Sequence, residues 1–277
     1  MTSSHANQHR LSIERVSLRY GERHVVEDLS LALPDGEITV IVGPNACGKS
    51  TLLRAMSRLL RPTEGRIVLD GADIHRLATR KVAQVLGLLP QSPIAPEGIV
   101  VADLVARGRH PHQRAFTRWS RTDEEAVLAA LRATGVAELA ERSVDELSGG
   151  QRQRVWIAMA LAQQTDLLLL DEPTTFLDVT HQVEVLDLLI DLNRSRGTTI
   201  AMVLHDLNLA ARYADHLVAM RDGNVVAAGV PTQIVTPDLV RDVFGLEAQV
   251  VADPVSGTPL VVPIGRHHAS ASAAVVH

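Results

Sequence analysis

The feature that most constrains this chain is a glycine-rich loop between an apolar run and an amphipathic segment. The loop reads GPNACGKST, from Gly43 to Thr51, and the apolar run before it covers residues 38–42. The spacing of its glycines and of Lys49 and Ser50 fits the phosphate-binding pattern G-x-x-x-x-G-K-[ST]. Glycines let backbone N–H groups turn inward as an anion nest, and a following helix adds its positive dipole end. We therefore predict a strand, a phosphate-binding loop and a helix in this order.

The residue types in this loop predict separate roles. Lys49 has the charge and reach to bind the β- and γ-phosphates of a nucleotide, and the Ser50 hydroxyl can ligate Mg²⁺. The alternative is a glycine-rich turn with a chance lysine, and the flanking strand and helix patterns argue against it. The predicted nucleotide contacts are Gly43, Pro44, Asn45, Ala46, Cys47, Gly48, Lys49, Ser50 and Thr51.

Length and charge limit the classes of protein that this chain can be. Its 277 residues are 46% apolar, enough for a sizeable core in one large domain or two joined ones. The net charge of −5 argues against binding nucleic acid through bulk charge, so we expect no nucleic-acid partner. No run of ~18 apolar residues occurs, and the N-terminus has no apolar signal segment. We expect a cytoplasmic protein that can dock on a membrane component.

The single cysteine, Cys47, excludes a disulfide framework. It lies beside Lys49 and just before a predicted helix N-terminus. Both features favour the thiolate, which predicts a reactive thiol that an alkylating reagent reaches. The alternative is a thiol packed under the loop and inert.

Two further apolar runs end in polar residues that suit nucleotide chemistry. Residues 167–170 are four leucines, typical of a strand buried on both faces, and Asp171 and Glu172 follow. Adjacent carboxylates near a core need a counter-charge, which Mg²⁺ at Asp171 would supply, while Glu172 would polarise the attacking water as general base. The strand predicted at 199–204 ends at His205, which can contact the γ-phosphate or the water. A structural histidine is the alternative.

Two other strand ends carry candidate ligands. Tyr20 follows an alternating strand at 11–18 and can stack on an adenine ring, although an ordinary strand-edge tyrosine is an equal alternative. Gln91 follows a buried run at 85–89 and can offer its amide oxygen to a metal or to water. A solvated loop glutamine is the alternative there.

The stretch LSGGQ, residues 147–151, is a second motif. Ser148 and Gln151 form a capping-box pattern for a helix predicted at 151–162. Two glycines inside the cap cost stability, which makes sense if a ligand approaches the backbone closely. Because a helix N-terminus suits a phosphate, we predict nucleotide contacts from Ser148, Gly149, Gly150 and Gln151. The alternative is a well-capped helix without a ligand.

These motifs together resemble one family, the ATP-binding-cassette (ABC) ATPases. The motifs that match, in chain order, are the adenine-stacking Tyr20, Walker A at 43–51, the Q-loop Gln91, the signature at 147–151, Walker B at 167–173, the D-loop at 176–178 with Asp178, and the switch histidine His205. One departure is Ala46, where many members have glycine.

Within the family, the chain looks most like ATPase subunits of importers for ferric siderophores, haem and vitamin B12. The likeness lies in RGRHPHQ (107–113), EPTTFLDVTHQVEVLDLL (172–189) and VLHDLNLAARYADHLVAMRDG (203–223), with Phe176 where other members often have histidine. It implies Mg²⁺-dependent ATP hydrolysis that drives uptake of an iron(III)-siderophore. Vitamin B12, haem or a metal ion are alternative cargoes. A soluble ABC ATPase acting on nucleic acid or ribosomes, or a non-enzymatic nucleotide switch, are less favoured.

The resemblance implies an α/β fold: a RecA-like P-loop NTPase core with a small antiparallel β part and an inserted α-helical subdomain. We place the core at 10–90 and 155–264, the helical subdomain at 91–154, and disordered ends at 1–9 and 265–277. The implied catalytic residues are Glu172, His205, Gln91 and Lys49, and the implied Mg²⁺ ligands are Ser50, Gln91 and Asp171.

The resemblance also implies partners. Two copies would pair head to tail, so that the signature of one closes over Walker A of the other. The pair would sit on the cytoplasmic face of the membrane under a polytopic permease, with a substrate-binding lipoprotein beyond it. We expect a permease helix to dock near residues 91–109. Residues 108–114, a basic loop with two histidines, are interpreted as solvated or partner-facing, with Arg107 and Arg109 at the surface.

Overall fold

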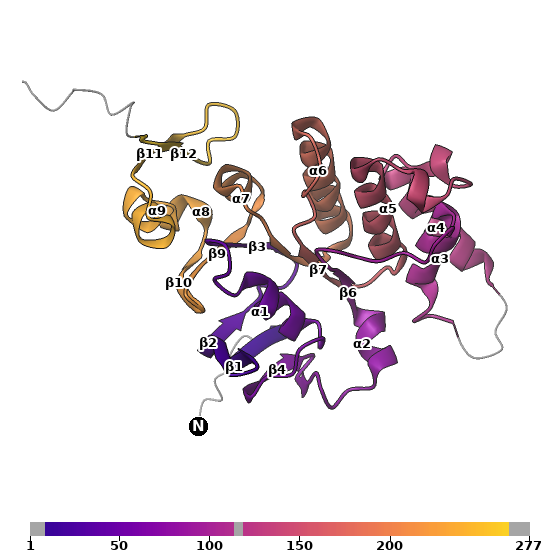
Figure 1. Cartoon of the computed structure of the whole chain (residues 1–277), viewed down its shortest axis with the longest axis horizontal. Coiled ribbons are helices and arrows are strands. Elements are labelled where there is room, and N and C mark those ends of the chain that lie inside the picture. The colour runs from indigo at the N-terminus through magenta and orange to yellow at the C-terminus, as the bar shows by residue number, and fades with distance from the viewer. Residues whose placement is uncertain (1–8, 114–118, 266–277) are drawn as a thin grey trace, which may run out of the picture.

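The computed structural model describes residues 9–113 and 119–265. The ends predicted to be disordered, 1–9 and 265–277, fall outside the described residues except for 9 and 265. Within the described part, a six-stranded sheet runs through the middle of the molecule in the order β10-β9-β3-β8-β7-β6 (Figure 1). Its strands are β3 (Ile38–Val42), β6 (Leu86–Leu89), β7 (Leu167–Asp171), β8 (Thr199–Val203), β9 (His216–Arg221) and β10 (Asn224–Gly229).

The four leucines before Asp171 show that this sheet is buried on both faces. Leu168 and Leu170 join the core that contains the helical lobe, whereas Leu167 and Leu169 join the core around α1 (Lys49–Met56). Strands β6, β7, β8, β3 and β9 pair in parallel, and only β10 pairs antiparallel at the edge. A parallel sheet covered on both faces favours such unbroken apolar runs. The strands predicted from them are confirmed.

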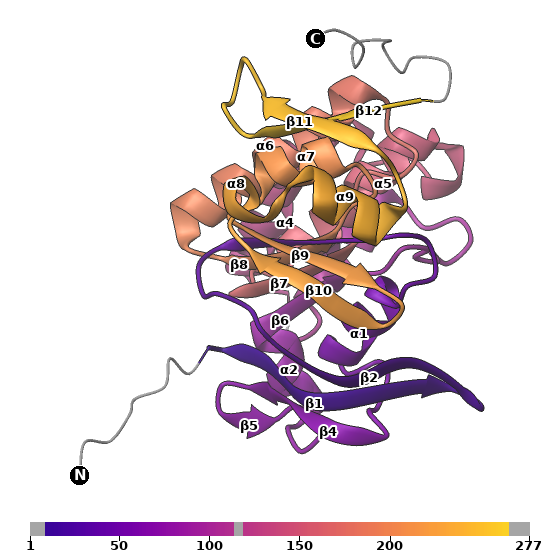
Figure 2. The ribbon, with the colours of Figure 1, turned by 90° about the vertical axis from the view of Figure 1, so that its left-hand side faces the viewer.

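A second, antiparallel sheet lies on the far side of α1 (Figure 2). It has the order β2-β1-β4-β5, with β1 (Leu11–Tyr20), β2 (Arg23–Ala32), β4 (Glu64–Leu69) and β5 (Ala72–Asp73). Leu52 and Leu53 of α1 are fully buried in one cluster with Ile13 and Leu69. The small antiparallel part predicted beside the core is therefore present, and it holds α1 against the large sheet.

The helical lobe follows β6. It contains α3 (Val101–Ala106), α4 (Arg121–Ala133), α5 (Gly149–Ala162) and the 3-10 turns η1 (Arg107–Arg109), η2 (Ala137–Leu139) and η3 (Val144–Glu146). The sequence pattern did not predict α2 (Thr79–Val85), which precedes β6 directly. Helix α5 runs without a break through residue 154, so the predicted subdomain boundary lies inside one helix.

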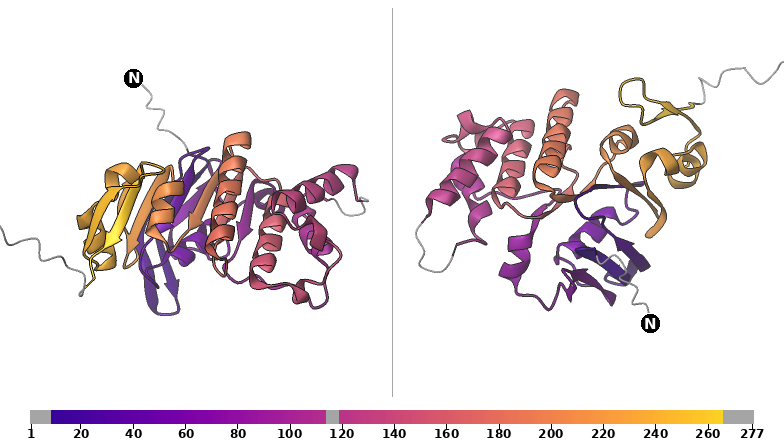
Figure 3. Two further views of the ribbon diagram at one scale, coloured as in Figure 1. Left: turned by 90° about the horizontal axis from the view of Figure 1, so that it is seen from above. Right: turned by 180° about the vertical axis from the view of Figure 1, so that it is seen from behind.

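The remaining elements cover the sheet and close the chain. Helix α6 (Val179–Arg196) stands between the helical lobe and the C-terminal elements in both views of Figure 3. The C-terminal elements are α7 (Leu207–Tyr213), α8 (Pro231–Ile234), α9 (Pro237–Phe244), β11 (Ala248–Ala252) and β12 (Pro259–Pro263). Among the described residues, no helix has the length and apolar character needed to cross a membrane.

Candidate active site

A cavity of about 720 Å³ opens where the parallel strands end at their carboxyl side. This is the usual place for a ligand in an open α/β sheet, and the volume suits a small molecule. Loops after β3, β6, β7 and β8 reach it, because parallel strands bring those loops to one edge. The predicted residues that line it are Tyr20, Asn45, Ala46, Gly48, Lys49, Ser50, Thr51, Gln91, Glu172 and His205.

The loop between β3 and α1 is built to receive an anion. Lys49 is 5% exposed, and its Nζ donates hydrogen bonds to the carbonyl oxygens of Gly43 at 2.8 Å and Pro44 at 2.9 Å. A Cβ at Gly43 would lie 2.1 Å from the Met220 carbonyl oxygen, so only glycine fits there. Because Gly48 at the N-cap has no side chain, it leaves the first-turn N–H groups of α1 to a ligand.

Ser50 and Asp171 meet beside this loop. The Ser50 hydroxyl donates to Asp171 Oδ1 at 2.9 Å, and both residues line a smaller cavity of about 270 Å³ together with Gln91. Burial raises the pKa of the Asp171 carboxyl, while the Ser50 bond opposes that shift. A hydroxyl, a carboxylate and an amide oxygen are hard donors of the kind that Mg²⁺ takes, so these three residues fit the ion.

Glu172 and His205 form the most specific contact of the site. His205 Nε2 lies 2.6 Å from Glu172 Oε1, and the Thr175 hydroxyl donates to Glu172 Oε2 at 3.2 Å. Glu172 is 7% exposed and takes a φ of 55°, in the left-handed region that side chains other than glycine rarely adopt. Strain of this kind persists where the surroundings hold a residue in place. The carboxylate is thereby fixed at the cavity by both of its oxygens.

Tyr20 also lines the cavity and is 46% exposed. Its hydroxyl accepts a hydrogen bond from Arg54 Nη1 at 3.2 Å, so α1 fixes the position of the ring. The sequence did not point to Arg23, His24 and Val25 at the start of β2, which line the same cavity.

The turn between β9 and β10 also borders the cavity through Asp222 and Gly223. The Gly223 N–H donates to the Cys47 carbonyl at 3.0 Å, and a Cβ at Gly223 would lie 2.2 Å from the Val25 carbonyl oxygen. Asp222 and Gly223 form the hairpin turn between β9 and β10. No local sequence pattern indicates that this turn contacts the phosphate loop, which lies far earlier in the chain.

The signature residues and Asp178 do not line this cavity. Ser148 and Gln151 form the predicted capping box, with Gln151 N donating to Ser148 Oγ at 3.3 Å and Ser148 N to Gln151 Oε1 at 3.1 Å. Asp178 caps α6 by accepting from His181 N at 2.9 Å. The phosphate loop and the signature of one chain therefore do not share one pocket.

The expectation of a reactive Cys47 is wrong. The residue is 4% exposed and packs in the core around α1, so its side chain points away from the cavity. Burial raises the pKa of the Cys47 thiol, and this effect outweighs the nearby Lys49 ammonium, whose Nζ lies 3.9 Å from Sγ. The loop backbone, and not the thiol, borders the phosphate region.

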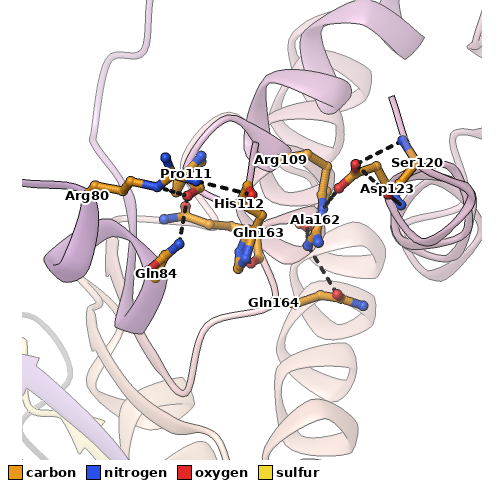
Figure 4. Close-up of polar contacts among 10 residues, drawn as sticks. All are labelled: Arg80, Gln84, Arg109, Pro111, His112, Ser120, Asp123, Ala162, Gln163 and Gln164. Atoms are coloured by element: carbon orange, nitrogen blue, oxygen red, sulfur yellow. Dashed lines mark hydrogen bonds and ion pairs between the residues drawn. The ribbon is translucent and has the colours of Figure 1, made fainter. Parts of the chain in front are cut away.

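The expectation that Arg109 lies at the surface is wrong (Figure 4). Gly108 is also buried, whereas His110 is exposed, and the partner-facing interpretation of residues 108–114, of which the structure describes 108–113, stays a prediction. Arg109 is 5% exposed, and its guanidinium donates to Asp123 Oδ1 at 2.9 Å and to the Ala162 carbonyl at 2.8 Å. His112 Nε2 donates to the Gln163 carbonyl at 2.7 Å. The side chains of Arg80 and Gln84 in α2 both donate hydrogen bonds to the Pro111 carbonyl oxygen. Residues 109–112 therefore connect the end of α5 to α2 (Figure 4).

Comparisons with known proteins place this geometry in a family. The ABC transporter family matches residues 26–175. The chain is 56% identical over 257 residues to the ferric enterobactin transport ATP-binding protein FepC of Escherichia coli (strain K12), which covers 93% of this chain and 95% of that protein. It is 55% identical over 259 residues to the petrobactin import ATP-binding protein FpuD of Bacillus anthracis, with coverages of 94% and 95%.

A solved structure gives the same result for the fold. An inward-facing metal-chelate type ABC transporter contains a chain that is 32% identical, with a TM-score of 0.79 over 93% of this chain and 98% of that one. Similarity at this level extends over the core and the helical lobe together, which confirms the predicted α/β cassette. The chain therefore belongs to the ABC transporter family, as an ATP-binding subunit that hydrolyses ATP.

Proposed function

We propose that this chain drives uptake of an iron(III)-siderophore by hydrolysing ATP beneath a membrane permease. The observation that carries the chemistry is the carboxylate of Glu172, held at the cavity by His205 and Thr175. A buried carboxylate at such a place suits the general base that takes a proton from the attacking water. The cargo rests on the two relatives, whose names specify ferric enterobactin and petrobactin.

The loop residues supply binding. When ATP enters, Lys49 exchanges the carbonyl oxygens of Gly43 and Pro44 for phosphate oxygens, which are stronger partners because they are charged. The N–H groups at the start of α1 face the same phosphates. Mg²⁺ held by Ser50, Asp171 and Gln91 would neutralise phosphate charge. The Tyr20 ring lines the same cavity and is available to stack on the adenine.

The separation of the signature from the cavity supports a paired state. Ser148, Gly149, Gly150 and Gln151 form a helix N-terminus that does not border the pocket of its own chain. A second copy placed head to tail would bring its signature to this pocket, and the symmetry would make two equal sites.

We also propose a polytopic permease above the pair, a substrate-binding lipoprotein beyond it, and a location on the cytoplasmic face of the membrane. The permease contact remains a prediction for residues 91–107, without Arg109.

An uptake assay tests the proposal. Cells lacking their own siderophore-importer ATPase, and supplied with this chain and its permease, should accumulate radioactive iron from ferric enterobactin. Cells supplied with Glu172→Gln should not, because the amide cannot act as a base. If the wild-type chain restored uptake of cobalamin or haem and not of the iron chelate, the cargo assignment would be overturned while the ATPase assignment stood.

A further inference from the structure

The C-terminal hairpin of β11 and β12 lies against α7, the helix that follows His205 (Figure 2). Asn208, in the first turn of α7, makes two hydrogen bonds to one residue of β12. Val261 N donates to Asn208 Oδ1 at 2.7 Å, and Asn208 Nδ2 donates to the Val261 carbonyl at 3.2 Å. Because both ends of the amide are used, its orientation is fixed by the hairpin.

Asn208 is also linked to the switch histidine through the backbone. Its N–H donates to Asp206 Oδ1 at 2.8 Å, and the Leu209 N–H donates to the same atom at 2.9 Å. Asp206 directly follows His205, whose Nε2 lies 2.6 Å from Glu172 Oε1. A path of hydrogen bonds, with the peptide bond between Asp206 and His205 as one step, therefore runs from β12 through the start of α7 to Glu172.

The hairpin holds α7 at its other end as well. Arg212, in the last turn, forms an ion pair with Asp253, which is 6% exposed. A helix as short as α7, Leu207–Tyr213, has little stability of its own, so its position depends on what packs against it. The two anchors differ in one respect: Asn208 lies in the first turn, beside His205, whereas Arg212 lies in the last.

We propose that the hairpin, acting through Asn208, positions His205 against Glu172 and thereby sets the rate of ATP hydrolysis. Asn208 is a positioning residue, since it touches neither the cavity nor the reacting groups. The inference rests on the proposed roles of Glu172 and His205. It predicts an effect on turnover and none on nucleotide binding, because the hydrogen bonds of Asn208 go to Asp206 and Val261 and not to the phosphate loop between β3 and α1.

The test is steady-state ATP hydrolysis by the full-length chain carrying Asn208→Ala. We expect kcat to fall about tenfold, less than the ~100-fold that a ~1 Å misplacement can cause, with KM for ATP unchanged. Val255→Ser is the matched control, because Val255 lies in the hairpin loop and is 87% exposed. Asp253→Asn releases the anchor at the far end of α7. It should lower the melting temperature and reduce kcat less than Asn208→Ala does.

A double-mutant cycle with His205→Ala separates positioning from general destabilisation. If Asn208 acts through His205, adding Asn208→Ala to His205→Ala should leave the residual rate unchanged. An equal tenfold loss in both backgrounds, a raised KM, or a wild-type kcat for Asn208→Ala would each overturn the proposal. If Asn208→Ala does not fold, Asn208→Asp, which keeps an acceptor for Val261 N but loses the donor to the Val261 carbonyl, decides the question in the same cycle. A fall in kcat that disappears in the His205→Ala background supports the proposal, and any other result overturns it.

Glu172→Gln distinguishes failure of this inference from failure of the proposed function. If Glu172→Gln abolishes turnover and Asn208→Ala has normal turnover, only the proposed role of the hairpin is refuted. If Glu172→Gln has normal turnover, the assignment of Glu172 as the general base is refuted, and the proposed role of the hairpin is refuted with it.

Discussion

Glu172 combines burial, a left-handed backbone and two hydrogen-bond partners in one residue. If it is the general base, Glu172→Gln should lower kcat about 100- to 10,000-fold, because the amide keeps the shape but cannot accept the proton. Nucleotide affinity should stay near the wild-type value, since the phosphate loop is untouched. Phosphate release and nucleotide titration measure the two effects, and phosphate release near the wild-type rate would refute the role.

Ala46 takes a φ of 62°, in the left-handed region that glycine adopts most easily, which explains why glycine suits this position of the phosphate-binding loop. A left-handed conformation costs a residue other than glycine roughly 1–2 kcal/mol, while glycine adds about 0.4–1 kcal/mol of unfolded-state entropy. Ala46→Gly should therefore raise the free energy of unfolding by up to about 1.5 kcal/mol, as measured by urea denaturation without nucleotide. A loss of stability in that experiment would contradict the strain at Ala46.

The fold should protect the Cys47 thiol from alkylation. Since the thiol is 4% exposed and burial raises its pKa, a maleimide should label it only as fast as the protein opens. Labelling should become complete within the reaction time in denaturant, where the thiol is free. Fast labelling of the native chain without nucleotide, slowed by ATP, would instead place the thiol at the phosphates.

At the scale of elements, the 107–113 segment is held by the buried ion pair of Arg109 and Asp123. Removing one partner of such a pair leaves an uncompensated charge and costs about 3–5 kcal/mol. Arg109→Met should therefore destabilise the chain strongly, and Arg107→Ala, at an exposed position in the same turn, should not. Urea denaturation of both variants measures this difference, and similar stabilities would contradict the burial of Arg109.

The same ion pair predicts that the free energy of unfolding depends on pH. The Ser120 hydroxyl, followed by the Arg109 guanidinium, lowers the pKa of Asp123 below its ordinary value of 3.8. A lowered folded-state pKa contributes stability that is present above the unfolded value and is lost as pH falls through the folded value. The stability gap between wild type and Asp123→Asn should thus be full at neutral pH and shrink below about 4. A gap that stays constant down to pH ~3 would show that the carboxylate is not stabilised by these groups.

At the scale of the whole molecule, the separation of signature and cavity predicts pairing that depends on ATP. Glu172→Gln with ATP should form a stable dimer, because bound nucleotide joins the two copies and is not hydrolysed. Adding Ser148→Arg should prevent the dimer, since a long side chain at the start of α5 would fill the space of the phosphate. Light scattering after size-exclusion chromatography checks both variants, and a monomer of Glu172→Gln at saturating ATP would contradict head-to-tail pairing.

The sequence by itself determined the elements around the nucleotide site, because the signals for them are local. The apolar runs at 38–42, 167–170 and 199–204 give buried strands, and the glycines and lysine of the loop follow one strand directly. Parallel pairing then brings the strand ends together, so that Lys49 and Glu172 line one cavity. The capping box at Ser148 is local in the same way.

Only the tertiary structure decided which side chains are buried and which distant segments meet. Cys47 and Arg109 occur in stretches that look exposed or reactive, yet the core around α1 covers the first, and Asp123 with the end of α5 covers the second. Gly223 closes on Cys47, and Asn208 is held by Val261, across separations that no local pattern encodes. Burial and long-range hydrogen bonds depend on the packing of the whole chain, whereas a strand or loop motif depends on its neighbours in sequence.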